Sequence, residues 1–262
     1  LSSSSAASDV YKRQHCILLI GGTNIIGKNF GPIDDKLDQS NNRIKIFDFE
    51  NNDFIIAKEP LKHVHHSNPS SIGFSLTFCK YFLSTIPEHD EIYIIGYGNN
   101  NTGFTPIKNT SWRVNYHGNS IPKKLIKDIN PIIKKYKLKM KGMISMIGEN
   151  DYNNPNYLMD YKLLIDYLRE NIYINQNNLP VLIGTVIESN KNIINCKRIN
   201  NELIKLRDMM NNVRIVKLTM FKENYDEKHY GANDLRKIGL EFFKSFQNKK
   251  LLKMFNKKIV TL

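Results

Sequence analysis

Cysteine is scarce in this chain, which has only Cys16, Cys79 and Cys196 among its 262 residues. Three widely spaced cysteines argue against a framework of disulfide bonds and favour a reducing, intracellular compartment. The chain also lacks any apolar run near the 18 or so residues that a membrane-spanning helix needs, so no membrane span is predicted. A hydrophobic core is therefore expected to hold the fold together.

Linker-like sequence is also missing. No Pro-, Gly- or Ser-rich stretch divides residues 15–247, which we interpret as one α/β domain. Residues 1–14 resemble a translated sequencing adapter and are interpreted as non-native, in which case the native N-terminus, with any signal peptide, would be missing. Residues 248–262 are interpreted as a basic C-terminal extension.

Acidic residues are outnumbered by basic ones, and the formal net charge is +13. The excess is spread along a chain that over-uses Lys, Asn and Ile, a bias that needs no binding partner to explain it. No aromatic-basic motif of a known nucleic-acid-binding module is present. We therefore predict no nucleic-acid partner.

Apolar runs, and the turn and helix-capping residues between them, predict alternating strands and helices. Buried strands are predicted over residues 16–20, 92–95, 142–147, 180–185 and 213–218, with a hairpin over 43–56. Helices are predicted over residues 71–84, 120–136, 154–171, 193–210 and 232–246. This alternation indicates a three-layer α/β/α sandwich, in which helices cover both faces of a mainly parallel sheet of about five strands.

Polar turns follow three of these strands. They are Gly21-Gly22-Thr23-Asn24, Gly148-Glu149-Asn150-Asp151 and Asp226-Glu227-Lys228-His229. Each alone has a plain explanation, as a turn, a lead-in to a helix or a solvated loop. Because ligands bind at the carboxyl edge of open parallel sheets, we expect the three turns to meet there.

Together, the turns supply the parts of an acyl-transfer site. The hydroxyl of Thr23 can act as a nucleophile, and His229 can take its proton. Asp226 stands three residues before His229, where it can fix the tautomer of the imidazole. The side-chain amide of Asn150 can donate to a developing oxyanion.

The ordered set of motifs resembles the SGNH (GDSL-like) hydrolases, and more closely their sialate O-acetylesterase and carbohydrate esterase branch. That branch typically has Gly-Gln-Ser-Asn where this chain has Gly21 to Asn24, and Gly148 to Asp151 and Asp226-x-x-His229 match its later blocks. The run over residues 71–78 is similar to the helix that follows its first block. The resemblance implies a flavodoxin-like SGNH fold and an ester hydrolase that removes acyl groups, mainly acetyl, from a carbohydrate without a cofactor or metal.

Two positions depart from the family pattern. Thr23 replaces the nucleophilic serine, keeping the hydroxyl but adding a methyl that restricts χ1. Asn100-Asn101-Thr102 replaces a Gly-Gly-Thr that lends a backbone N–H to the oxyanion hole. By the resemblance, the oxyanion hole consists of the backbone N–H of Thr23, a backbone N–H near Asn100, and the side chain of Asn150.

Substrate contacts are expected from Asn24 and Glu149, and from a long loop over residues 96–118. Trp112 and Arg113 in this loop can pack on a sugar ring and meet a carboxylate, respectively. An equally open alternative is that Trp112 only pins the loop to the body of the domain.

Three histidines that are close to one another in the chain, His63, His65 and His66, suggest a zinc site, but no carboxylate or cysteine near them completes a ligand set. No metal site is therefore predicted.

Two other functions stay open at this point. A catalytically inactive member of the family would keep the cleft as a glycan-binding module. A flavodoxin-like phosphate or nucleotide binder is disfavoured, because the first turn lacks the glycine spacing of the nucleotide fingerprints and Asp226 and His229 would have no role.

Overall fold

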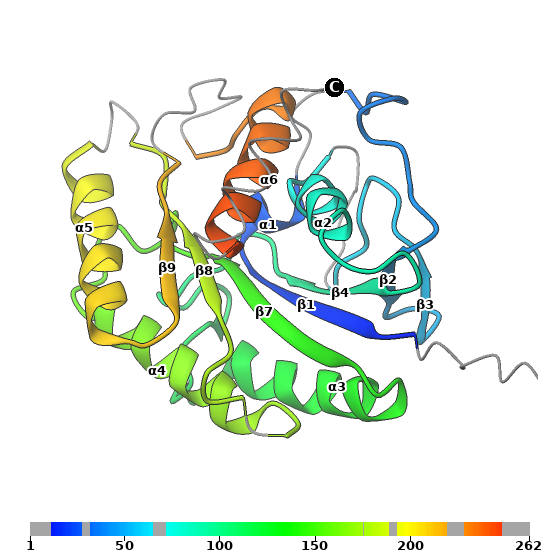
Figure 1. The fold of residues 1–262 in the computed structure, drawn as a ribbon. Helices are drawn as coiled ribbons and strands as arrows, with labels where there is room; N and C mark the ends of the chain where they lie inside the picture. The colour runs from blue at the N-terminus through cyan, green and yellow to red at the C-terminus, as the bar shows by residue number, and fades with distance from the viewer. Residues whose placement is uncertain are drawn as a thin grey trace, which may run out of the picture.

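The computed structural model describes residues 12–27, 32–64, 72–174, 176–188, 193–218 and 228–247. Its centre is a seven-stranded sheet in the order β3-β2-β4-β1-β7-β8-β9, parallel throughout except for β3 (Figure 1). The strands are β1 (Gln14–Gly21), β2 (Ile44–Asp48), β3 (Asp53–Ile56), β4 (Glu91–Gly98), β7 (Lys139–Met146), β8 (Val181–Gly184) and β9 (Val213–Val216). The predicted three-layer α/β/α class is confirmed.

The sheet is wider than the five strands predicted. All five predicted strands form, and the predicted hairpin adds β2 and β3 beyond β4. The hairpin joins because Ile44 and Ile46 of β2 face the same apolar layer as β4 and pair with it in parallel. A short parallel pair, β5 (Thr110–Ser111) with β6 (Asn119–Ser120), lies within the long loop after β4.

Helices cover both faces of the sheet (Figure 1). The long ones are α2 (Ser75–Leu83), α3 (Ile121–Lys135), α4 (Tyr157–Asn171), α5 (Ile193–Met209) and α6 (Ala232–Phe246). The apolar sides of α3, α4 and α5 share one core layer, while those of α2 and α6 share the other. None of the helices in the described ranges is long and apolar enough to cross a membrane.

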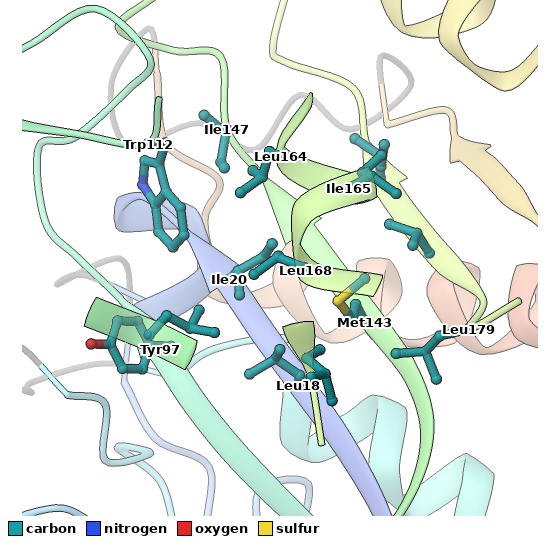
Figure 2. Packing of buried hydrophobic residues seen from close by; sticks show 14 of the residues in the cluster. Leu18, Ile20, Tyr97, Trp112, Met143, Ile147, Leu164, Ile165, Leu168 and Leu179 are labelled. Atoms are coloured by element: carbon teal, nitrogen blue, oxygen red, sulfur yellow. The ribbon is translucent and has the colours of Figure 1, made fainter. Parts of the chain in front are cut away.

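Strand β1 separates the two core layers. Leu18 and Ile20 enter the layer of α3, α4 and α5, which Figure 2 shows from close by, and Ile17 and Leu19 enter the layer of α2 and α6. All four side chains are buried, as expected for a central parallel strand covered on both sides. The turn that follows β1 therefore starts from a central strand that is buried on both faces.

The ends of the predicted domain can be compared with the structure only in part. Strand β1 begins at Gln14, the last residue of the segment interpreted as non-native, and the amine of Lys12 forms an ion pair with Glu91 (2.6 Å). Residues 1–11 and the basic extension, 248–262, lie outside the described residues. The domain boundaries thus stay predictions.

Candidate active site

The turn after β1 depends on the first of its two glycines. Gly21 has φ +146°, and a Cβ there would lie 2.2 Å from the carbonyl oxygen of Met146, so a larger residue would collide with the end of β7. The next N–H, that of Gly22, donates to the same carbonyl (3.0 Å). Thr23 then begins the short helix α1 (Thr23–Ile26) and is half-buried at the carboxyl edge of the sheet.

The loop after β4 reaches the same place. The N–H of Asn99 donates to the carbonyl of Gly21 (2.9 Å), and the N–H of Asn101 makes a long contact, 3.5 Å, with Oγ1 of Thr23. Asn101 has φ +52°, a left-handed conformation that asparagine tolerates better than most residues other than glycine. The backbone N–H that faces the hydroxyl is therefore that of Asn101, next to the predicted Asn100.

Asn150, after β7, lies beside this loop. Its side-chain amide donates to the carbonyl of Thr102 (3.2 Å), and the residue is half-buried. An amide nitrogen carries two hydrogens, so this bond fixes the group and leaves a second donor. Segments after β1, β4 and β7 thus meet at one edge, as the sequence predicts.

Asp151 supports the same loop, a role that the sequence analysis missed. Its buried carboxylate accepts from the N–H groups of Phe104 (3.0 Å) and Thr105 (2.7 Å). Burial raises its pKa, with these hydrogen bonds acting in the opposite direction. The signal available in the sequence was its place at the end of the Gly-Glu-Asn-Asp motif, after a predicted strand.

Asn24 and Glu149 form a buried link between three segments. The amide nitrogen of Asn24 donates to Oε1 of Glu149 (2.7 Å) and to the carbonyl of Lys228 (2.8 Å). Asn24 is 3% exposed and Glu149 is 8% exposed. The pair predicted to contact substrate is instead engaged in holding together the turns after β1 and β7 and the segment before α6.

The same link places His229 at the edge that carries Thr23. Asn24 follows Thr23 and Lys228 precedes His229, so a 2.8 Å hydrogen bond joins the neighbours of the two proposed catalytic residues. On the other side of His229, Tyr230 is buried and its hydroxyl donates to the carbonyl of Thr185 (3.3 Å). His229 itself is half-buried. Asp226 lies outside the described residues, so its pairing with His229 stays a prediction.

Trp112 is not on the candidate binding surface. It is 0% exposed, and its indole N–H donates to Oγ1 of Thr102 (3.0 Å), which in turn donates to the carbonyl of Asn99 (2.7 Å). Figure 2 shows it among the apolar side chains of the core. The ring of Trp112 is enclosed and offers no face to a sugar. Trp112 therefore anchors the loop that faces Thr23, which is the alternative stated in the sequence analysis.

Arg113 is engaged with the start of α4. Its guanidinium donates to the carboxylate of Asp160 (2.8 Å) and to the side-chain oxygen of Asn154 (3.1 Å). The guanidinium of Arg113, which was expected to meet a substrate carboxylate, thus forms an ion pair with Asp160 within the protein.

His63 also has a structural partner. It is buried, and its Nδ1 accepts from the N–H of Gly98 (3.1 Å) at the end of β4. His65 and His66 lie outside the described residues. In the part of the chain that the structure covers, no group of three or more His, Cys, Asp or Glu side chains is placed to hold a metal ion.

Comparison with known proteins places these features in a family. Residues 13–248 match the family described as "SASA: Carbohydrate esterase, sialic acid-specific acetylesterase". Among curated proteins, no sequence matches the chain.

Solved structures share the fold at low sequence identity. A protein from Arabidopsis thaliana is 16% identical with a TM-score of 0.74, over 88% of this chain and 97% of that one. NanS is 14% identical with a TM-score of 0.73, over 94% of this chain and 98% of that one. Est24, a carbohydrate acetylesterase from Sinorhizobium meliloti, is 11% identical with a TM-score of 0.52, over 89% and 97% of the two chains.

Proposed function

The chain belongs to the sialic acid-specific acetylesterase family of carbohydrate esterases, and on this premise we propose that it removes O-acetyl groups from a carbohydrate by a Thr-His-Asp mechanism. The observation that carries the proposal is the convergence at one sheet edge. The hydroxyl of Thr23 is in contact with a backbone N–H of the loop after β4, and the hydrogen bond from Asn24 to Lys228 ties the His229 segment to the same turn.

The proposed reaction follows from these positions. Oγ1 of Thr23 attacks the carbonyl carbon of the acetyl ester while His229 takes the hydroxyl proton. The tetrahedral oxyanion receives hydrogen bonds from the N–H groups of Thr23 and Asn101 and from the amide of Asn150. The intermediate collapses, the sugar oxygen leaves with the proton from His229, and a water molecule then hydrolyses the acetyl-threonine ester to release acetate.

Two residues have supporting roles in this scheme. Asp226 accepts a hydrogen bond from the imidazole of His229 and holds its tautomer. Asn24 acts through the backbone of Lys228, so we assign it a positioning role in place of direct substrate contact. Glu149, which accepts from the Asn24 amide, completes this support.

A second candidate function is an inactive, glycan-binding member of the family. Thr23 is the observation that favours it, because a β-branched side chain at the start of a helix has little freedom of χ1 with which to approach a carbonyl carbon.

Substitutions of Thr23 separate the two functions. We expect Thr23→Ser to raise the release of acetate from O-acetylated sialic acid, because the serine hydroxyl gains rotamer freedom, and we expect Thr23→Ala to abolish it. The measurement is acetate release by each purified protein, with far-UV circular dichroism as a control for folding. Equal background rates for all three proteins, together with retained binding of acetylated glycan, would replace the esterase with the binding module. Equal activity of the parent and Thr23→Ala would show that another group reacts.

A further inference from the structure

A large hollow lies next to the candidate active site. Its volume is about 1120 Å³, and its wall includes residues 99–102 of the loop after β4, the turn over residues 107–110 and the first turn of α3. Asn101 belongs both to this wall and to the active site, because its N–H contacts the hydroxyl of Thr23. One stretch of backbone thus separates the proposed nucleophile from the hollow.

The charges on the wall have one sign. Lys108, Lys123 and Lys124 line the hollow, and no Asp or Glu does. Lys124 forms an ion pair with Asp128 (2.6 Å), whereas neither Lys108 nor Lys123 has an acidic partner in the described part of the chain. Two ammonium groups without an acidic partner in the described residues therefore face a cavity that shares Asn101 with the candidate site.

Lys108 stands at an unusual backbone position. Lys108 and Asn109 have φ +46° and +59°, and the backbone of Ile107 and Thr110 exchanges hydrogen bonds across them in a tight turn. Asn or Gly takes such positions at less cost than lysine. The turn is held against the opposite wall, because the N–H of Asn119 donates to the carbonyl of Asn109 (3.0 Å).

The remaining wall suits a carbohydrate. Half-buried Tyr116 lines the hollow, and its hydroxyl donates to the side-chain oxygen of Asn109 (3.0 Å), which fixes the ring. The side chains of residues 99–101 are all amides. A fixed aromatic ring and several amides are complementary to the C–H face and the hydroxyl groups of a sugar.

The volume of the hollow indicates how many sugar rings it can hold. Pockets that enclose a drug-sized ligand have roughly 300–1,000 Å³, so this hollow has room for more than one sugar ring. We propose that it binds acidic sugars adjoining the acetylated one, so that the preferred substrate is a carboxylated oligosaccharide whose charges meet Lys108 and Lys123. The inference rests on the proposed function for the place of the reacting group.

Binding of unacetylated sugars tests the inference without hydrolysis. The probes are a linear sialic acid trimer, free sialic acid and neutral maltotriose, with dissociation constants measured by titration calorimetry at low and at physiological salt. We expect the trimer to bind at least about tenfold more tightly than either other probe, and to bind less tightly as salt is added. The double variant Lys108→Gln/Lys123→Gln should lose on the order of tenfold in trimer affinity.

A matched variant controls for the change in net charge. Lys197→Gln/Lys205→Gln removes two lysines of α5, a helix that contributes no residue to the wall of the hollow, and should bind the trimer as the parent does. Equal trimer binding by the parent and the Lys108/Lys123 variant would overturn the inference. So would equal affinity for trimer and monomer, or for trimer and maltotriose.

Acetate release separates this inference from the proposed function. If the parent and Thr23→Ser release no acetate but the trimer binds in a lysine-dependent way, the esterase proposal fails and the hollow stands as an acidic-glycan site. If acetate is released and the trimer shows no lysine-dependent preference, the esterase proposal stands and the hollow has no such role.

Discussion

Histidines stand at both edges of the sheet, and their surroundings differ. At the amino edge, Nε2 of His15 lies 2.8 Å from a carboxylate oxygen of Asp90, and both residues are buried. At the carboxyl edge, His229 is half-buried on a segment tied to the turn that carries the Thr23 hydroxyl. The buried pair has the geometry of a catalytic His-Asp pair, yet its described contacts include no hydroxyl.

The amino-edge pair has a structural role. Asp90 also accepts from the N–H of Arg13 (3.1 Å), so it connects the start of β1 to the start of β4. Burial lowers the pKa of His15, although the hydrogen bond to Asp90 acts to raise it. Burial acts to raise the pKa of Asp90, but the hydrogen bonds from His15 and Arg13 outweigh it and leave that pKa below its usual value. A His-carboxylate contact is thus no evidence of catalysis unless an accessible nucleophile adjoins it.

The largest expected effect comes from the same substitution at the two histidines. His229→Ala should lower acetate release by the Thr23→Ser variant by at least about a thousandfold, because the base is lost, with little change in stability. His15→Ala should leave the activity per folded molecule near the parent value. It should cost about 1–3 kcal/mol of unfolding free energy, because Asp90 loses its buried partner.

Steady-state kinetics and urea unfolding of both variants check this prediction. A His15→Ala protein as inactive as His229→Ala, while still folded, would reverse the assignment of the two edges.

The second effect concerns the link that holds the His229 segment. Asn24→Ala removes the hydrogen bonds to Glu149 and to the carbonyl of Lys228, so we expect kcat to fall on the order of tenfold with KM nearly constant, the sign of a displaced base. Glu149→Gln keeps an oxygen that accepts from Asn24 and serves as the matched control, with a smaller loss. A large rise in KM for Glu149→Gln with unchanged kcat would instead support the substrate contact expected from the sequence.

The smallest effect is on stability and involves the buried carboxyl group of Glu59, in the segment after β3. Glu59 is buried, and its carboxylate accepts from the N–H groups of Leu61 (3.1 Å) and Gly73 (3.3 Å). Burial raises the pKa of Glu59 to about 8 against the effect of these bonds. Between its usual pKa near 4.5 and 8, the folded state holds a proton that the unfolded state has released, so stability falls as pH rises through this window.

Thermal unfolding at pH 6 and pH 7 checks the sign. The loss attributable to Glu59 is on the order of 1 kcal/mol per pH unit. It should be absent in Glu59→Gln, which keeps an oxygen for both N–H groups. The effect of Asp90 on stability has the opposite dependence on pH. Because its pKa is lowered in the folded state, Asp90 stabilises the fold above the usual pKa of an aspartate, and this stabilisation is lost as the pH falls below that value. The same pH slope in the parent and in Glu59→Gln would contradict the assignment.

Local pattern was enough for most of the fold. The run from Cys16 to Ile20 ending at Gly21 and Gly22 predicted a buried strand and a turn, since a central parallel strand must be apolar on both faces. Helix α6 has the predicted bounds, because its apolar spacing and the preceding glycine leave little choice. The number of strands was underestimated because a hairpin looks the same in sequence whether or not it joins the main sheet.

The sequence by itself determined the α/β/α class, the family and the order of the polar turns, because each strand, helix and motif is a run of neighbouring residues and their order can be seen directly in the chain. Only the tertiary structure decided what those polar residues contact. The amide of Asn24 reaches Glu149 and Lys228, which are 125 and 204 positions away, and Trp112 is buried in the core layer that α3, α4 and α5 share. Burial and long-range hydrogen bonds depend on how separate elements pack, and no local spacing encodes them.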